Sequence, residues 1–421
     1  MAKDPETVKT FLQGLSDLLG PVAEAELAEL KKLKAEAEGG SAEGQTIHMW
    51  DFRFYLNAAE ERKYKVDHEV LRQYFPFDAV LEGMLGVYRD VFGLVFTELK
   101  GTQVWHESVM VFKVSEADTS ELLGYFYLDL WPRPGKFSHA ACWPLQKACD
   151  LPADRAQWCQ PKAGRVAQAA DTAGPSVAPL APFRRPAVTA LVCNFPAPKA
   201  DGSPPLLEHN EVVTFFHEFG HGVHNLCSKT QLARFAGTGT ERDFVEAPSQ
   251  MLENWCWEAV SLARISRHVE TEAPIPKHLV DSLVAAKNAN VGLLTCRQLF
   301  FGIFDQTIHS QPKSDTAAIL AELHPKVMRV PMSDGTNFAA SFGHMCGYDA
   351  QYYGYMWSEV FSDDMFVSAF KQDPMSRSAG RAYCEKVLAR GGSKDAAEML
   401  RDFLGREASQ ASFLKAKGLK P

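Results

Sequence analysis

Apolar positions recur at helical spacing along most of this chain. The first such segment starts at Asp4-Pro5 and carries apolar residues at three- and four-residue intervals up to Leu19. Gly20-Pro21 is expected to break this helix, and a second, charged helix is expected to follow as far as Gly39-Gly40-Ser41. The same spacing predicts two more helices, at residues 48–64 and 77–92.

The spacing changes to the alternation of β-strands after residue 100. Residues 103–114 and 122–130 read as two strands, and Asp118-Thr119-Ser120 is expected to form the turn between them. Residues 186–195 read as a third strand. The segment between, 147–185, is rich in Ala, Pro, Gly and Gln and has no clear period, so we predict a disordered surface insertion.

Helical patterns then continue to the end of the chain. For the first of them Asn210 is a plausible N-cap, and Glu211 suits the first turn because a negative charge is favourable there. The chain is therefore predicted to be mainly α with a small β-sheet. The predicted helices are 211–226, 255–268, 276–288, 291–310, 314–324, 353–371, 375–389 and 393–404.

Composition narrows the class of protein. A chain of 421 residues exceeds the size of a single core, which predicts one large or two closely packed domains. The net charge of −8, without a basic patch, argues against a nucleic-acid partner. No apolar run has membrane-spanning length, and the first residues do not resemble a signal peptide. Nine scattered cysteines without a C-x-x-C pair favour a reducing compartment. We therefore expect a cytoplasmic protein, although a longer form could carry an organelle signal.

The strongest chemical signal is the run His217-Glu218-Phe219-Gly220-His221. On a helix, His217 and His221 lie one turn apart on the same face, so both imidazoles can reach one zinc ion. Glu218 can then lie beside the open position of the metal and handle the proton of a water molecule. The alternative is a helix with two unrelated histidines. It is disfavoured because residues 211–216 carry apolar residues all round, as a buried helix would.

A third ligand has to come from outside this pentapeptide, because catalytic zinc usually has three protein ligands. The three-histidine class H-E-x-x-H-x-x-G-x-x-H is excluded, since His224 occupies its glycine position and Cys227 its last histidine position. We interpret His224 as a packed residue near the ligands. Glu246 and Glu253 lie seven residues apart among apolar residues, so either could be a ligand, a helix cap or an ion-pair partner.

Several further runs accompany the pentapeptide. Residues 241–255 read Glu-Arg-Asp-Phe-Val-Glu-Ala-Pro-Ser-Gln-Met-Leu-Glu-Asn-Trp, and residues 347–355 read Gly-Tyr-Asp-Ala-Gln-Tyr-Tyr-Gly-Tyr. Together they closely resemble the thimet oligopeptidase and neurolysin family of zinc oligopeptidases. The resemblance runs from about residue 4 to the C-terminus with one gap. Shorter matching runs are Trp-Asp-Phe-Arg-Phe-Tyr at 50–55, Phe-Tyr-Leu-Asp-Leu at 126–130, and His-Ala-Ala-Cys at 139–142.

The resemblance implies a helical zincin-type metallopeptidase with a small β-sheet beside the active-site helix. It implies one zinc ion per chain, bound by His217, His221 and Glu246, with Glu218 as general base and acid. The implied substrates are short peptides, which an edge strand of the sheet can hold by main-chain hydrogen bonds. We expect the protein to act as a monomer.

The resemblance also implies substrate contacts from a mobile, tyrosine-rich loop. Tyr352 and Tyr355 would face the scissile peptide bond, and His344 would contact the bound substrate. Two departures from the family accompany these matches. The segment 344–348 is one residue shorter and lacks one glycine, and Met1 aligns to the middle of the family's chain.

These observations predict an N-terminal helical segment, 1–100, that packs on a catalytic region, 101–421. The predicted function is zinc-dependent endopeptidase activity on short peptides. The alternative is a weakly active or inactive protein that binds zinc and peptide, because the N-terminal wall of the family's substrate channel is absent from this sequence.

Overall fold

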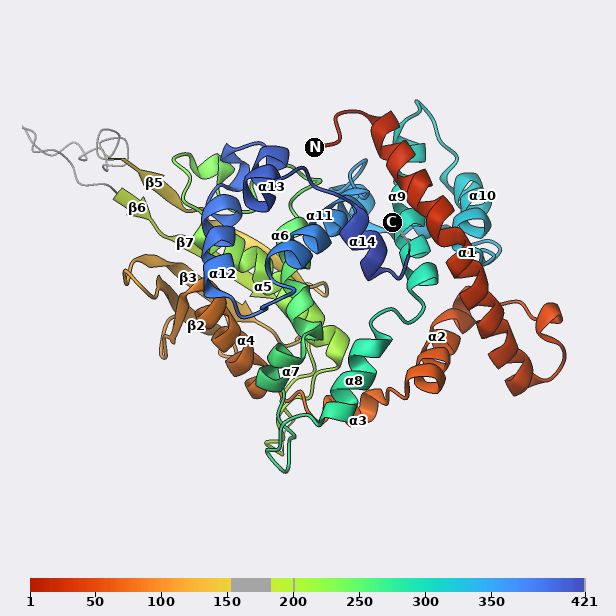
Figure 1. The fold of residues 1–421 in the computed structure, drawn as a ribbon, viewed down its shortest axis with the longest axis horizontal. Helices are drawn as coiled ribbons and strands as arrows, with labels where there is room; N and C mark the ends of the chain where they lie inside the picture. The colour runs from red at the N-terminus through yellow and green to blue at the C-terminus, as the bar shows by residue number, and fades with distance from the viewer. Residues whose placement is uncertain (153–182, 200, 420–421) are drawn as a thin grey trace, which may run out of the picture.

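The computed structural model describes residues 1–152, 183–199 and 201–419, and helices form most of it (Figure 1). The α-helices are α1 (Pro5–Glu38), α2 (Met49–Tyr64), α3 (His68–Arg72), α4 (Phe77–Phe92), α5 (His209–Cys227), α6 (Ala247–Glu253), α7 (Ala259–Ile265), α8 (Lys277–Ala286), α9 (Val291–His309), α10 (Thr316–Met328), α11 (Gly354–Ala369), α12 (Arg377–Tyr383), α13 (Ala396–Leu404) and α14 (Ala411–Ala416). The strands are β1 (Leu94–Glu98), β2 (Met110–Glu116), β3 (Leu122–Asp129), β4 (Ala141–Gln146), β5 (Cys149–Leu151), β6 (Phe183–Arg185) and β7 (Ala187–Val192). The predicted class, mainly α with a small β-sheet, is confirmed.

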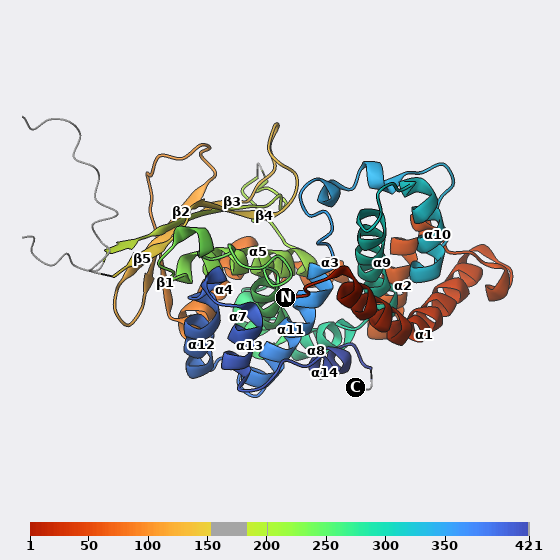
Figure 2. The same ribbon diagram turned by 90° about the horizontal axis from the view of Figure 1, so that it is seen from above.

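Two apolar clusters form the core. One joins the sheet to α4, α5, α7, α8, α12 and α13, and the other joins α1, α2, α9, α10 and α14. Helix α11 contributes residues to both clusters. Figure 2 shows the sheet at one end of the molecule and α1, α2, α9 and α10 at the other. The division at residue 100 stays a prediction; α4, which precedes that residue, packs with the sheet.

The N-terminal helix does not break where the sequence suggested. Helix α1 runs from Pro5 to Glu38 and passes through Gly20-Pro21 without interruption. It packs along α9, where Glu26 accepts a hydrogen bond of 2.8 Å from the backbone N–H of Leu293 in the first turn of α9. The prediction of a break was wrong because tertiary packing stabilises the helix across the proline, which alone would disfavour it.

The main sheet has the strand order β1-β2-β3-β7-β4. The central pair β3 and β7 is parallel, and the other pairs are antiparallel. Strands predicted at 122–130 and 186–195 are confirmed as β3 and β7, whereas the strand predicted from residue 103 begins only at Met110. Strands β1 and β4 were missed. In β4, Pro144 interrupts the pattern, which the fold tolerates because β4 lies at the sheet edge.

Helix α5 is packed tightly on both sides. Toward the sheet, the ring of Phe219 lies 4.7 Å from that of Phe126 on β3, and a Cβ atom added to Gly222 would lie 2.2 Å from the Phe126 ring. Toward α6, a Cβ atom added to Gly220 would lie 2.9 Å from the Cα atom of Ser249. The two glycines therefore allow close approach on two faces of the helix.

The start of α5 differs from the prediction. The residue before the helix is Glu208, not Asn210, and the helix begins at His209. The backbone N–H of Glu208 donates to the carboxylate of Glu211 at 2.8 Å, so Glu211 rather than Asn210 caps this end.

The segment 147–185 has regular structure at its ends. Strands β5 and β6 pair antiparallel, with Leu151 opposite Phe183. The prediction of a wholly disordered insertion is therefore wrong at these ends, and residues 153–182 of the predicted insertion lie outside the described residues.

The helices predicted after residue 255 are present with shifted ends. The pattern at 255–268 forms the shorter α7, and α10 continues to Met328 beyond the predicted end at residue 324. The helix predicted at 375–389 changes at Cys384 into a π-helical turn, Cys384–Leu388. Among the described residues, no helix has both the length and the apolar character that crossing a bilayer would require.

Candidate metal centre

His217 and His221 project from one face of α5. Their ring centroids lie 5.0 Å apart, and their Nε2 atoms lie 3.2 and 3.1 Å from the same carboxylate oxygen of Glu246, the residue that precedes α6. One ligand atom from each residue lies within 4.8 Å of the others, so this group could hold a metal ion. The structure therefore brings together the three residues that the sequence nominates as ligands.

Glu246 is buried, and its neighbours stabilise its negative charge. Burial raises the pKa of Glu246, but the charge of His221 and hydrogen bonds from both histidines outweigh burial and lower the pKa well below its ordinary value. Ser249 Oγ donates to one carboxylate oxygen at 3.2 Å, and the Tyr348 hydroxyl donates to the other at 3.0 Å. Positive or hydrogen-bonding groups thus surround a carboxylate that would otherwise be costly to bury.

Glu253 contacts a different nitrogen of His217 from Glu246, a distinction that the residue pattern alone left open. Its Oε1 atom lies 2.7 Å from Nδ1 of His217, on the side of the ring away from Glu246. Burial lowers the pKa of His217, but its hydrogen bonds to Glu246 and Glu253 outweigh burial and raise it well above the ordinary value. A carboxylate on Nδ1 fixes the ring and leaves Nε2 to face a metal.

We therefore expect the Glu253→Gln variant to bind the metal about 10- to 100-fold more weakly than the unmodified protein, because loss of such a carboxylate loosens and weakens its histidine ligand. Competition with a chromophoric chelator measures this affinity. Glu270→Gln changes an exposed glutamate outside the cluster and is the control. Equal affinities for a folded Glu253→Gln variant and the control would contradict the role given to Glu253.

Glu218 follows His217 on α5 and is largely buried, with 9% of its surface exposed. Burial, and to a lesser degree the negative charge of Glu218, raises the pKa of Cys142 on β4 to about 12. The same two causes raise the pKa of Cys193, which follows β7. The charge of Glu218 also contributes to the raised pKa of Tyr355, so this carboxylate influences groups on the sheet and in the tyrosine-rich segment.

His224 is buried one turn beyond His221 and is not in the group of potential ligands. Neither of its ring nitrogens has a hydrogen-bond partner within the described part of the chain. Burial, with a smaller contribution from the charge of His221, lowers the pKa of His224 to about 3. It is a neutral, packed residue, which agrees with its interpretation from the sequence.

The tyrosine-rich segment reaches the metal centre. Nε2 of His344 lies 3.3 Å from the hydroxyl oxygen of Tyr355 at the start of α11. Burial raises the pKa of Tyr355, and the charge of Glu246 raises it further, so its hydroxyl stays protonated. The hydroxyl of Tyr352 instead donates to Gln298 on α9 at 2.9 Å. The rings of His344, Tyr352 and Tyr355 thus lie together, with centroids 5.1 to 5.8 Å apart, and the hydroxyl of Tyr352 is bound to α9.

Tyr348 is a residue of this site that the sequence interpretation missed. Its hydroxyl donates a hydrogen bond to Glu246, one of the potential ligands, and its ring stacks on Tyr355 with centroids 5.3 Å apart. The guanidinium of Arg242 lies over the Tyr348 ring, 5.2 Å from its centroid. The only sequence signal was its membership of the tyrosine-rich run, which did not distinguish it from its neighbours.

A cavity of about 790 Å³ adjoins the metal centre. Its lining includes Glu253, His344, Tyr352 and Tyr355, so a molecule bound in it would meet three of the four residues predicted to act on substrate.

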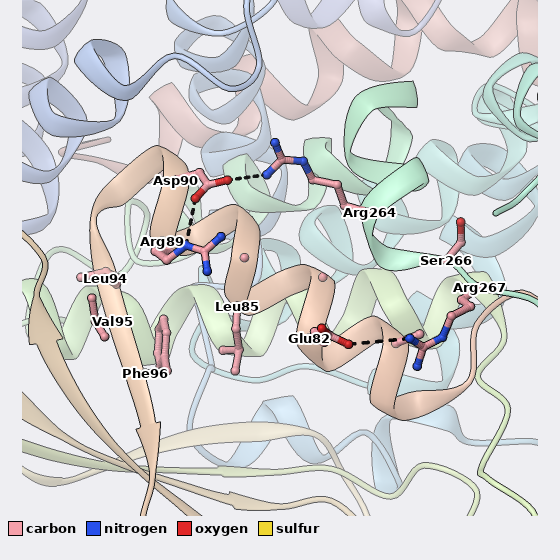
Figure 3. Close-up of a pocket in the computed structure, with 13 residues that line it drawn as sticks. Glu82, Leu85, Arg89, Asp90, Leu94, Val95, Phe96, Arg264, Ser266 and Arg267 are labelled. Carbon is pink, nitrogen blue, oxygen red and sulfur yellow. Dashed lines mark hydrogen bonds and ion pairs between the residues drawn. The ribbon is translucent and has the colours of Figure 1, made fainter. Parts of the chain in front are cut away.

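A second cavity, of about 720 Å³, lies between α4, β1 and α7 (Figure 3). Asp90 pairs there with Arg89 and Arg264, and Glu82 pairs with Arg267 (Figure 3). It contains none of the predicted site residues.

Comparison with known proteins places these features in one family. Residues 1–419 match the model of Peptidase family M3. The chain is 37% identical over 431 residues to "Thimet-like oligopeptidase" of Dictyostelium discoideum, and all of the chain aligns with 60% of that protein. It is 38% identical to "Saccharolysin" of Saccharomyces cerevisiae and 35% identical to "Oligopeptidase A" of Escherichia coli; all of the chain aligns with 57% and 58% of these proteins. The chain therefore spans less than two thirds of the length of these relatives.

Proposed function

Because the chain belongs to peptidase family M3, we propose that it hydrolyses peptide bonds in short peptides with a zinc ion held by His217, His221 and Glu246. The observation that carries the proposal is the convergence of two histidines on one oxygen of Glu246, beside the buried Glu218 and the tyrosine-rich segment. The names of the relatives, which include two oligopeptidases, support peptides as the substrate class.

The three ligands fit zinc by their chemistry. Two imidazole nitrogens and one carboxylate form a common ligand set of catalytic zinc, which keeps a further position open. Glu253 occupies the other ring nitrogen of His217, so Nε2 is the atom available to the metal. When bound, zinc polarises a carbonyl group and lowers the pKa of a water molecule.

Glu218 provides the proton transfer. Its place directly after His217 on α5 puts it beside the proposed ligands, and it is not a member of the cluster. It accepts a proton from the attacking water and passes that proton to the leaving amine nitrogen. A glutamine at this position would keep the shape and lose the proton acceptor.

Tyr355 and His344 act on the substrate. The carbonyl oxygen of the scissile bond becomes negatively charged during attack, and the protonated hydroxyl of Tyr355 donates a hydrogen bond to it. Burial lowers the pKa of His344, so its imidazole is neutral near pH 7 and can contact a peptide without adding charge.

An extended peptide suits the surroundings of this centre. Among the described residues, strand β4 pairs with β7 alone in the five-stranded sheet and packs against α5, so we propose that its other edge offers backbone groups to a peptide. Main-chain hydrogen bonds to such an edge do not depend on side chains, so binding tolerates many sequences. Folded proteins present few free extended segments, which favours short peptides.

We expect the Tyr355→Phe variant to lose about 10²- to 10³-fold in kcat, the effect of removing one donor to a developing oxyanion. The KM should change little, because the hydroxyl acts mainly in the transition state. Steady-state kinetics on one fluorogenic peptide measure both. Tyr383→Phe is the control, since the Tyr383 hydroxyl is buried and has no partner in the described residues. Equal kcat values for the two variants would remove Tyr355 from the mechanism.

Incubation of the protein with a quenched fluorescent peptide, with and without added zinc, tests the proposed function. Mass spectrometry of the products identifies the cleaved bond, and a folded protein of similar composition is the comparison substrate. Cleavage of the peptide alone is the expected result. One zinc ion bound per chain without cleavage would instead support the alternative, a protein that binds zinc and peptide without turnover. This alternative is worth testing because the chain spans only part of the length of its relatives.

A further inference from the structure

A buried carboxylate on α9 holds the segment that leads into the catalytic tyrosines. Asp305 has no exposed surface. Its Oδ1 atom accepts a hydrogen bond from the backbone N–H of Ala350, and its Oδ2 atom accepts one from the backbone N–H of Tyr352, each at 2.9 Å. One side chain therefore binds two amides of the tyrosine-rich segment, which are some 45 residues away along the chain.

Neighbouring contacts fix the same short segment. Nε2 of Gln306 donates to the carbonyl oxygen of Ala350 at 2.8 Å, and Nδ1 of His309 lies 2.8 Å from Oδ1 of Asp305. Ala350 has a φ of 59°, in the left-handed region that a residue with a Cβ atom rarely adopts. Since alanine would relax from this conformation when unsupported, the contacts from α9 must maintain it.

The position of this segment decides where Tyr355 lies. The backbone N–H of Tyr355 donates to the carbonyl oxygen of Tyr352 at 3.2 Å, in the turn that opens α11. Fixing the amide of Tyr352 therefore also fixes the turn that carries Tyr355. A carboxylate is suited to this task because both of its oxygens accept hydrogen bonds, whereas an amide side chain offers only one acceptor.

We propose that Asp305 is a positioning residue for hydrolysis, whose two carboxylate oxygens hold the backbone of Ala350 and Tyr352 so that the Tyr355 hydroxyl meets the substrate. This role rests on the proposed function, but the hold on the segment is a property of the fold that can be measured without catalysis. Asp305 itself does not touch the substrate, since it is fully buried.

The Asp305→Asn variant tests the proposal by two independent measurements. Hydrogen exchange followed by mass spectrometry should show faster exchange of the amides at 350–352, with the metal-binding helix unchanged. In the peptide assay, kcat should fall on the order of tenfold to 10²-fold, as expected for a misplaced catalytic group, with little change in KM. In combination with Tyr355→Phe the losses should not add, because both changes remove the same contribution.

Asp364→Asn is the matched control. Like Asp305, Asp364 is fully buried and accepts a hydrogen bond from a backbone N–H, here that of Ser409. It also accepts one from Arg406, so it anchors the C-terminal segment rather than the tyrosine-rich segment. We expect it to lower thermal stability without slowing kcat. Gln306→Ala is a milder second variant that leaves Asp305 in place and should also speed exchange at Ala350.

Unchanged exchange at 350–352 in both Asp305→Asn and Gln306→Ala would overturn the proposed hold, whatever the activity. Faster exchange with an unchanged kcat, or losses that add fully with Tyr355→Phe, would overturn the positioning role. Absence of cleavage by the unmodified protein would instead count against the proposed function, and the exchange result would still stand by itself.

Discussion

Replacing Glu218 with glutamine should lower kcat for peptide hydrolysis by about 10³-fold, within the range that general acid–base catalysis contributes. Glutamine has nearly the same shape as glutamate, but its amide cannot accept the proton of the attacking water. Since Glu218 is not in the group of metal ligands, metal affinity should stay the same. The expected outcome is a folded, metal-loaded protein that still binds peptide.

Three measurements separate this outcome from a general loss of structure. Metal content by atomic emission, thermal unfolding and single-turnover cleavage should be recorded for Glu218→Gln and for Glu322→Gln. Glu322 is an exposed residue of α10 paired with Lys326, so its replacement changes the same functional group without reaching the site. A Glu218→Gln variant that keeps more than about a tenth of the activity would show that another group takes the proton, because that loss is below the usual contribution of such a group.

Removal of the metal should abolish hydrolysis and also destabilise the protein. A ligand that binds only the folded state at 1,000 times its dissociation constant stabilises that state by about 4 kcal/mol. The metal-free protein should therefore unfold at a lower temperature, and zinc should restore both stability and activity. The His221→Ala variant should behave like the chelated protein, since it lacks one of the three ligands.

His209→Asn is the control for the histidine replacement. His209 is buried on the same helix, but its Nε2 atom faces the backbone carbonyl of Cys256 rather than the ligands. Calorimetric scans with and without chelator should show a zinc-dependent shift for the unmodified protein and for His209→Asn, and no shift for His221→Ala. Hydrolysis that survives complete removal of the metal would rule out the proposed chemistry.

The sequence was most informative about features that depend on the spacing of residues within one helix or strand. His217 and His221 are one helical turn apart, so the motif by itself predicts that they share a face of the helix. Helices α2 and α4 were predicted to within a residue because no proline interrupts their helical patterns. The break at Gly20-Pro21 failed for the opposite reason, because contacts with α9 outweigh the local preference of α1.

The spacing of residues along the chain could not predict features that depend on contacts between distant segments. Glu246 and Glu253 look alike in the sequence. In the fold, the approach of α6 to α5 places Glu246 at Nε2 of His217 and Glu253 at Nδ1 of the same ring. Tyr348 is one of four tyrosines in its segment, and its bond to Glu246 spans 102 residues. The edge strand β4 was missed because its partner, β7, follows only after the long segment at 147–185.

The glycine inside the pentapeptide 217–221 has a consequence for how such a motif constrains substitution. Written as H-E-x-x-H, it leaves two positions open, and metal chemistry alone would accept any helix-forming residue in them. In this fold neither position is free, since Phe219 fills the core against the sheet and a Cβ atom at position 220 would lie 2.9 Å from the Cα atom of Ser249. Ser249 in turn hydrogen-bonds to Glu246. The absence of a side chain at position 220 therefore lets the segment around Ser249 pack closely on α5, and Glu246, the proposed third ligand, lies in that segment. A residue with no functional group would thus act as the spacer of the proposed metal site.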